Sequence, residues 1–289
     1  MEPRRYGPFP YTPIRGRPKL TWPDGARVAL WVAPNIEFFP FNEAIPFSIG
    51  TNPDVLGWSV RDYGARVGVF RIMDVLSRHG IRGTVCLNSE VCDAYPQVLE
   101  EAMKLDWEFM GHGESNARST DGLSLEDERK SIFTTFDRIE EFTGKRPRGW
   151  LSPNIRMSWN TLDILVEAGC EYFCDFTNDD QPYLMDIGGK RMVSVPYSLE
   201  INDFPAFMFQ NRTAEEFETM IKRQFDVLYR EGAESGRVMA ICLHPFLIGV
   251  PHRIDALDSA LEYIRGHDGV WLATGSEIMD HYLSSGATF

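Results

Sequence analysis

The chain has 289 residues, of which 43% are hydrophobic and 25% are charged, so it is long enough to bury the core of one large α/β domain. The formal net charge of −13 argues against binding to a nucleic-acid backbone, because phosphate contacts require Lys and Arg. The sequence has neither a secretory leader nor an apolar run of about eighteen residues, so we expect a cytoplasmic protein that does not enter a membrane.

The first 26 residues contain six prolines and show no strand or helix periodicity. We predict that residues 1–26 form an extended arm that wraps the domain or a neighbouring subunit. The apolar run 27–33 then indicates a strand that is covered on both faces. Residues 34–58 form a long loop rich in Phe, Pro, Asn and Gly, and a loop of this length is usually functional. We therefore expect it to form part of a binding mouth.

Strands and helices alternate along the rest of the chain, and several helices begin at a capping residue or end at a glycine. The predicted helices are 63–79, 95–105, 124–143, 160–168, 213–234, 254–265 and 275–283. The predicted strands are 82–87, 107–110, 148–151, 172–174, 192–195, 238–243 and 270–272. This alternation predicts parallel βα units that close into a barrel, with residues 27–289 as a single domain.

Two histidines follow predicted strands in the same way. His112 lies between two glycines directly after strand 107–110, and His244 directly follows the apolar strand 238–243. Functional groups gather at the carboxyl ends of barrel strands, so we expect both side chains in one cleft. Glu37, which follows the first strand and has apolar neighbours, is a candidate base in the same cleft.

Further polar side chains follow the predicted strand ends: Asn35, Asn88, Glu114, Asn116, Trp150, Ser152, Asp175, Asp179, Asp180, Tyr197 and Glu200. Carboxylates, amides and two histidines suit hydrolysis, which needs a base for water, an acid for the leaving group and donors for an oxyanion. Structural roles stay open for some of them. Asp179 and Asp180 are also typical turn residues before Pro182, and Trp150 also fits a core position.

These motifs, in this order, resemble the polysaccharide deacetylase (NodB-homology) superfamily from about residue 27 to residue 283. The resemblance implies a distorted (β/α)7 barrel of the NodB type. In that family the first strand ends in Thr-Phe-Asp-Asp, a His-x-x-x-His motif binds a divalent metal, and a late Leu-x-Leu-His carries the general acid. The corresponding segments here read Asn35-Ile-Glu-Phe38, His112-Gly-Glu-Ser-Asn116 and Ile241-Cys-Leu-His244.

The resemblance places Glu37 at the position of the base and Phe38 at the position of a metal-binding carboxylate. Asn116 replaces the second metal-binding histidine. One of the family's metal ligands therefore remains, whereas a zinc site needs at least three protein ligands. We expect no cofactor and no tightly bound metal, although weak binding of a divalent metal by His112 with Glu37 or Glu114 stays open.

Other segments resemble the allantoinase and cyclic-imide-hydrolase branch, among them Tyr63-Gly-Ala-Arg66 and the stretch from His244 to Arg253. The resemblance implies ring-opening hydrolysis of a carbon–nitrogen bond in a small cyclic amide, imide or ureide. Glu37 would activate water, and His244, oriented by Asp180 or Asp175, would protonate the departing nitrogen. The expected substrate contacts are His112, Asn116, Tyr63, Trp150 and one of the arginines Arg66, Arg148 and Arg253.

Two other functions stay open. One is a metal-dependent deacetylase of N-acetylated sugars in carbohydrate metabolism, and the missing ligands disfavour it. The other is a non-catalytic binding barrel, and the presence of both Glu37 and His244 disfavours that. In all three cases we expect a small-molecule ligand and no nucleic acid or membrane partner. The proline-rich arm and the resemblance together indicate a homo-oligomer.

Overall fold

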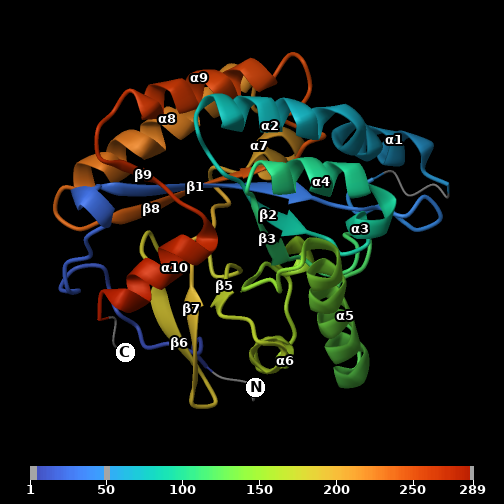
Figure 1. Cartoon of the computed structure of the whole chain (residues 1–289), viewed down its shortest axis with the longest axis horizontal. Coiled ribbons are helices and arrows are strands. Elements are labelled where there is room, and N and C mark those ends of the chain that lie inside the picture. Colours follow the sequence, from blue (N-terminus) through green and yellow to red (C-terminus); the bar gives the residue numbers. More distant parts are fainter. Residues whose placement is uncertain (1–4, 49–52, 287–289) are drawn as a thin grey trace.

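A curled sheet of mostly parallel strands forms the centre of the protein, seen in a computed structural model that describes residues 5–48 and 53–286 (Figure 1). The strand order is β6-β7-β5-β4-β3-β2-β1-β8, and β9 pairs with the first residues of β1. The predicted α/β architecture is confirmed, with the sheet curled into a half-barrel. The strands are β1 (Val28–Ile36), β2 (Thr84–Leu87), β3 (Glu108–Gly111), β4 (Gly149–Trp150), β5 (Tyr172–Phe173), β6 (Tyr183–Ile187), β7 (Lys190–Ser194), β8 (Arg237–Leu243) and β9 (Val270–Leu272).

Strand β1 is buried along its whole length and separates two parts of the core. Val28, Leu30 and Val32 pack with the helices that cover the outside of the sheet. The alternate residues, including Trp31, pack with the inner side chains of the curled sheet. Burial on both faces explains why this strand is a continuous apolar run in the sequence.

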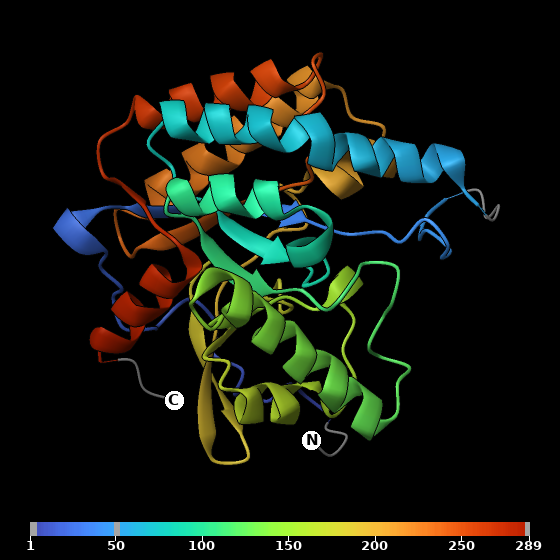
Figure 2. The same cartoon turned by 45° about the vertical axis from the view of Figure 1, so that its right-hand side comes forward.

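Helices cover the outer side of the sheet. Figures 1 and 2 show α2, α8 and α9 together over β1 and β8, and α4 and α5 further along the sheet beside β2 and β3. The helices are α1 (Val55–Tyr63), α2 (Val69–Arg78), α3 (Val91–Ala94), α4 (Pro96–Lys104), α5 (Leu125–Thr143), α6 (Thr161–Ala168), α7 (Asp203–Met208), α8 (Ala214–Glu231), α9 (Ile254–Arg265) and α10 (Gly275–Ser284). Helices α3 and α7 were not predicted.

The helix predicted for 63–79 begins eight residues earlier, at Val55, and continues through a π-helical turn, Gly64–Gly68, into α2. The glycines of this turn touch the loop that follows β8. A Cβ atom on Gly68 would lie 2.0 Å from the main-chain oxygen of Pro245, and one on Gly64 would lie 2.7 Å from the main-chain nitrogen of Phe246. The helix and the loop are therefore in direct backbone contact just after His244.

A hairpin replaces the lone strand predicted for 192–195. Strands β6 and β7 pair antiparallel, whereas the other paired strands of the sheet run parallel. The turn between them contains Gly188 and Gly189, both with positive φ (59° and 85°), which suits a two-residue hairpin turn that follows the sheet twist. The Gly-Gly pair was the sequence signal for this hairpin.

The free edge of β8 is partly covered by two connecting segments. The main-chain nitrogen of Val238 donates a hydrogen bond to the oxygen of Asp180 (2.8 Å), and that of Cys242 donates to the oxygen of Ile201 (2.9 Å). These contacts bring the segments that follow β5 and β7 beside β8 and help the sheet to curl. They also place Asp180 at the amino-terminal part of β8.

The described part of the N-terminal arm, residues 5–26, lies along the hairpin and α10 (Figure 1). Trp22 is buried against Trp271 and His281, and the main-chain oxygen of Pro8 accepts a hydrogen bond from the nitrogen of Asp186 (2.9 Å). The arm thus wraps its own barrel in the described residues. Residues 1–4 of the predicted arm lie outside that range.

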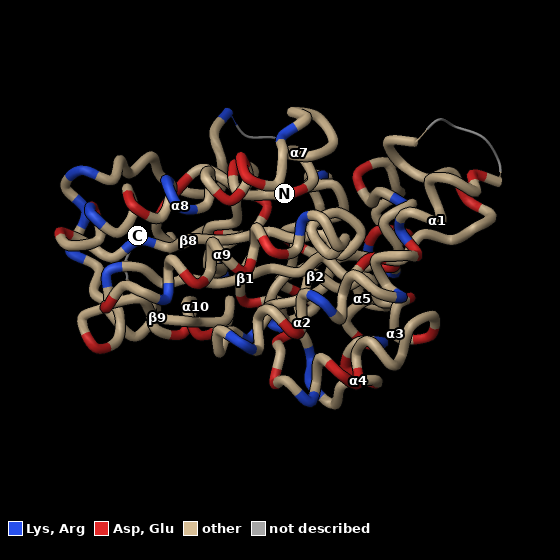
Figure 3. Tube along the Cα trace, turned by 90° about the horizontal axis from the view of Figure 1, so that it is seen from above, with Lys and Arg blue, Asp and Glu red and all other residues tan. Residues whose placement is uncertain are grey.

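Charged residues of both signs are interspersed along the chain, as Figure 3 shows. Within the described ranges, no helix combines the length and the apolar character that crossing a bilayer would require.

Candidate active site

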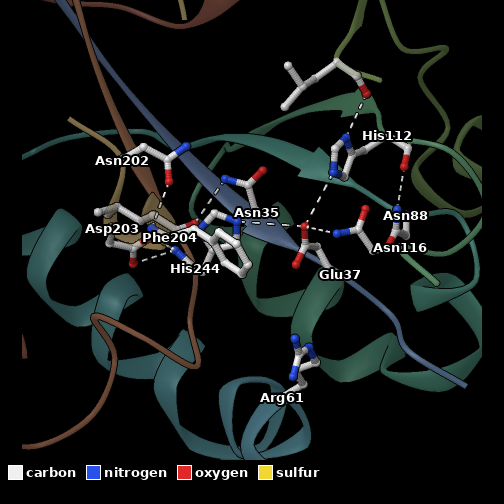
Figure 4. A network of polar contacts seen from close by, with 12 residues as sticks. Asn35, Glu37, Arg61, Asn88, His112, Asn116, Asn202, Asp203, Phe204 and His244 are labelled. Atoms are coloured by element: carbon white, nitrogen blue, oxygen red, sulfur yellow. Dashed lines mark hydrogen bonds and ion pairs between the residues drawn. The ribbon is translucent and has the colours of Figure 1, made fainter. Parts of the chain in front are cut away.

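A cavity of about 190 Å³ lies at the carboxyl ends of β1, β3 and β8. The ends of the strands supply Glu37, His112 and His244, and α1 supplies Arg61. The segment before α1 and the start of α7 supply much of the apolar wall. It is lined by Asn35, Glu37, Phe39, Pro46, Phe47, Arg61, His112, Asn116, Leu151, Asn154, Ile155, Tyr197, Leu199, Asn202, Phe204, Pro205, Phe209 and His244. The structure therefore brings together Glu37, His112, Asn116 and His244, which the sequence placed in one cleft (Figure 4).

Glu37 is the centre of the polar part of this cavity. Its side chain is 5% exposed, and its Oε1 lies 3.5 Å from Nε2 of His112 and 3.9 Å from Nε2 of His244. The amide nitrogen of Asn116 donates a 2.6 Å hydrogen bond to the same oxygen. Because a carboxylate can only accept, the amide of Asn116 must present its nitrogen to Glu37. The Oδ1 atom of Asn116 is buried and has no hydrogen-bond partner in the described structure.

His112 has a fixed ring orientation. Its Nδ1 lies 2.7 Å from the main-chain oxygen of Leu151, and since that oxygen can only accept, Nδ1 carries a proton. Nε2 is therefore the atom that faces Glu37. Gly113 follows with a φ of 73°, and a Cβ atom there would lie 2.6 Å from Pro153, so glycine allows the backbone to turn beneath His112.

His244 is held by Asp203, the first residue of α7. Nδ1 of His244 lies 2.7 Å from Oδ1 of Asp203, and the main-chain nitrogens of His244 and Ile248 donate to the same carboxylate. Burial lowers the pKa of His244, but the negative charges of Asp203 and Glu37 outweigh it and the pKa is raised above 6.5. A protonated His244 with its Nε2 in the cavity can act as a general acid.

The sequence-based assignment of Asp180 or Asp175 as the partner of His244 is corrected by this contact. Asp180 lies beside the amino-terminal part of β8, roughly 20 Å along the strand from His244 at about 3.3 Å per residue. Asp175 accepts a hydrogen bond from the main-chain nitrogen of Ser152 (2.8 Å). Its other oxygen is buried without a partner in the described structure, and burial raises the pKa of Asp175 to about 6.

The arginine of the cavity is Arg61, which the sequence analysis did not single out. Arg148 precedes β4 and pairs with Glu171 and Asp280 at the opposite end of the barrel, so its predicted substrate contact is corrected. Arg253 lies over the ring of Phe207 and does not line the cavity. Arg66 is paired with Asp62.

Two predicted aromatic contacts are also corrected. Trp150 is fully buried between the sheet and α5, where its ring stacks on Phe136 at 5.7 Å. Tyr63 accepts a hydrogen bond from Arg71 (2.7 Å) and does not line the cavity. Sequence position alone does not distinguish an aromatic side chain at a strand end that points into the core from one that points into a cleft.

Asn88 and the backbone of Phe38 fix the position of Glu37. The side-chain oxygen of Asn88 accepts from the main-chain nitrogen of Phe38 (2.9 Å), and its amide nitrogen donates to the main-chain oxygen of His112. The main-chain nitrogen of Asn116 donates to the oxygen of Phe38 (3.0 Å). Three segments that follow β1, β2 and β3 are thereby joined around Glu37.

The donor set does not fit a divalent metal. Phe38 packs against Tyr95, and Asn116 directs its amide nitrogen toward Glu37, so neither presents a ligand atom to the space between Glu37 and His112. Residues 5–48 and 53–286 contain no group of three or more His, Cys, Asp or Glu side chains arranged to hold a metal ion. Glu114 lines a separate cavity beside Arg118.

Comparison with known proteins agrees with this fold. Residues 58–173 match the family model described as polysaccharide deacetylase. A putative polysaccharide deacetylase of Schizosaccharomyces pombe is 29% identical over 240 residues, which cover 75% of this chain and 73% of that protein.

Two solved structures each superpose with a TM-score of 0.87 at 27% sequence identity. One is a probable polysaccharide deacetylase from Pseudomonas aeruginosa PAO1, and the comparison covers 95% of this chain and 97% of that one. The other is the PuuE allantoinase, with 95% and 96% covered. These matches confirm the predicted resemblance; the relatives named here are a putative deacetylase, a probable deacetylase and an allantoinase.

Proposed function

We propose that the protein opens a small cyclic amide, imide or ureide by hydrolysis, without a tightly bound metal. The match of residues 58–173 to the polysaccharide deacetylase model and the fold shared with an allantoinase support this proposal. The observation that supports this most is the position of Glu37, which has one imidazole on either side and, among the residues that the structure describes, no set of metal ligands around it. A carboxylate and two histidines can supply a base, an acid and a donor to the same reacting group.

In this reaction Glu37 takes a proton from a water molecule, and the resulting hydroxide attacks the carbonyl carbon of the ring. The bond between that carbon and nitrogen then breaks, and the electron pair goes to the nitrogen. His244 donates a proton from Nε2 to the nitrogen, while Asp203 stabilises the imidazolium through Nδ1. Glu37 and His244 are 3.9 Å apart, so the proton that Glu37 took up can return to His244 after each turnover.

His112 and Asn116 are proposed to bind the amide group itself. His112 can donate from Nε2 to the developing oxyanion only when both ring nitrogens are protonated, because Nδ1 is engaged with Leu151. The Oδ1 of Asn116 is buried without a partner in the described structure, and a shift of this side chain on substrate binding would let it accept a hydrogen bond from a ring N–H. One preorganised oxyanion donor typically contributes roughly 3–4 kcal/mol to transition-state stabilisation.

The proposal is tested with hydantoin, succinimide, allantoin and an N-acetylglucosamine oligomer, each incubated with chelator-treated and metal-supplemented protein. We expect ring opening of at least one cyclic amide at a rate that chelation does not change. Glu37→Gln, which keeps the shape and the contact with Asn116, should lower kcat by at least about 100-fold at an unchanged melting temperature. Stoichiometric metal together with chelator-sensitive deacetylation would instead establish a metal-dependent deacetylase.

A further inference from the structure

Arg61 is a cation in the cavity wall that has no carboxylate partner within salt-bridge distance among residues 5–48 and 53–286. Its Nη1 and Nη2 donate to the main-chain oxygens of Gly57 (3.0 Å) and Pro46 (2.9 Å). Its Nε is buried and has no hydrogen-bond partner there. A guanidinium has five N–H donors in a planar fork, so donors remain for a ligand.

The surroundings of Arg61 stabilise the cation only in part. The guanidinium lies over the rings of Phe39 and Phe246, at 4.8 and 5.3 Å from their centres. Such ring contacts are weaker than pairing with an anion, and burial lowers the pKa of Arg61 by more than the negative charges of Glu37 and Asp54 raise it. Other arginines near the barrel mouth do have carboxylate partners, such as Arg66 with Asp62 and Arg118 with Glu43. The missing anion of Arg61 is therefore a feature of this position in the cavity.

Arg61 and Glu37 give the two ends of the cavity opposite charges. Figure 4 shows Arg61 extending from α1 toward Glu37, with no direct contact drawn between them. Glu37 repels an anionic group and Arg61 attracts one, so a ligand with a negative end is oriented with its neutral amide toward the base. The apolar wall formed by Phe47, Phe204 and Phe209 suits the carbon skeleton between the two ends.

We propose that Arg61 binds a carboxylate on the substrate, so that the enzyme prefers cyclic amides that carry a carboxylate over neutral amides of the same size. A planar fork in which Nη1 and Nη2 each keep a second N–H matches the two oxygens of a carboxylate. The reaction part of this inference rests on the proposed ring-opening function, whereas the binding part depends only on the cavity.

The first test compares hydantoin-5-acetate with the neutral hydantoin-5-acetamide. For the wild type we expect kcat/KM to be at least about tenfold higher for the carboxylate, the effect of one charge-assisted hydrogen bond pair. Arg61→Met should remove this preference, mainly through a higher KM for the carboxylate, and Arg61→Lys should restore part of it. Arg66→Met, on the same helical segment, is the matched control and should keep the preference.

The second test measures binding without turnover. Succinamate, an already opened half-amide, and neutral succinamide are titrated into the wild type and the same variants by calorimetry. We expect succinamate to bind at least about tenfold more tightly, and this difference to vanish in Arg61→Met. A structural role of Arg61 alone would lower the melting temperature without changing the ratio of the two affinities, and that result would overturn the inference.

The two proposals fail separately. Equal turnover of the hydantoin pair by a ring-opening wild type overturns the role of Arg61 and leaves the proposed reaction intact. Arg61-dependent binding of succinamate in a protein that opens no cyclic amide supports the carboxylate site and overturns the proposed reaction.

Discussion

Both imidazoles beside Glu37 use Nδ1 elsewhere, which fixes their tautomers. Nδ1 of His112 donates to a main-chain oxygen and Nδ1 of His244 donates to Asp203, so each ring presents Nε2 to the cavity. An unprotonated Nε2 and a carboxylate are both acceptors and do not bond to each other. A proton at Nε2 of His244 resolves this conflict, and the raised pKa of His244 agrees with it.

Asp203→Asn tests whether His244 is protonated at Nε2 and acts as the general acid. The carboxylates of Asp203 and Glu37 raise the pKa of His244 against burial, so removing the Asp203 charge should lower that pKa. A general acid works only when protonated, so the alkaline limb of the profile of kcat/KM against pH should move to lower pH. Activity at pH 8 should fall at least about 100-fold. An unchanged alkaline limb would contradict the assignment of His244 as the acid.

Asp175→Asn tests the buried carboxyl beside Ser152. Burial raises the pKa of Asp175 from 3.8 to about 6, so the folded protein favours the neutral form and stability falls as the pH rises through about 6. Above that pH the ionised carboxyl costs roughly 3 kcal/mol at about 1.4 kcal/mol per pKa unit. Asparagine does not ionise and keeps an oxygen for the amide of Ser152. We expect calorimetry to show a higher melting temperature at pH 8 and little change at pH 4, and equal changes at both would contradict this explanation.

The loop after β8 is positioned by the π-helical turn between α1 and α2. Gly68 and Gly249 are in backbone contact, and Arg71 donates to the main-chain oxygen of Gly249 (2.8 Å). The same helical segment carries Arg61 at one side and meets Pro245, next to His244, at the other. This contact between the π-helical turn and the loop after β8 therefore positions His244 relative to Arg61.

Gly68→Ala tests the backbone contact between the π-helical turn and the loop after β8. The new Cβ atom would lie 2.0 Å from the main-chain oxygen of Pro245, and backbone on both sides leaves little room to adjust. We expect a loss of roughly 1–3 kcal/mol in the free energy of unfolding, typical of an overpacked contact, and a lower kcat as the loop that carries His244 shifts. Gly122→Ala is the control, because a Cβ there has no neighbour within 4 Å. Equal activity of the two variants would show that the contact does not position His244.

The N-terminal arm and the cavity lie at different parts of the barrel. Phe9 packs against Phe176 and Tyr183 beside the hairpin, and Arg17 pairs with Asp179. None of these residues lines the cavity with Glu37. The arm therefore contributes to the stability of the described barrel without touching the proposed chemistry.

Deletion of the first 19 residues tests whether the arm affects stability without affecting catalysis. This deletion leaves the buried Trp22 in place. We expect the free energy of unfolding to fall by roughly 1–3 kcal/mol through the loss of apolar burial, and kcat to stay within about twofold. Denaturant unfolding and steady-state kinetics measure the two effects. Light scattering on the same pair of proteins tests the predicted homo-oligomer and the contribution of the arm to it. A large loss of kcat in an intact barrel would contradict this separation.

The amino-acid sequence was enough to predict that Glu37, His112, Asn116 and His244 follow the ends of strands. Apolar runs identify buried parallel strands, and the carboxyl ends of such strands meet at one end of the barrel, so the order along the chain is enough to bring these side chains together. The same rule would have excluded Arg148, which lies at the start of a strand and therefore at the opposite end.

The partners of these residues depend on how distant segments of the chain pack together. Asp203 reaches His244 because the unpredicted helix α7 begins beside the end of β8, and Arg61 reaches the cavity because α1 begins at Val55. Asn202 as the cap of α7 and Asp54 as the cap of α1 were local signals for both helices. No local signal could show where those helices pack, since contacts between residues distant in the chain are set by packing of the whole sheet and its cover.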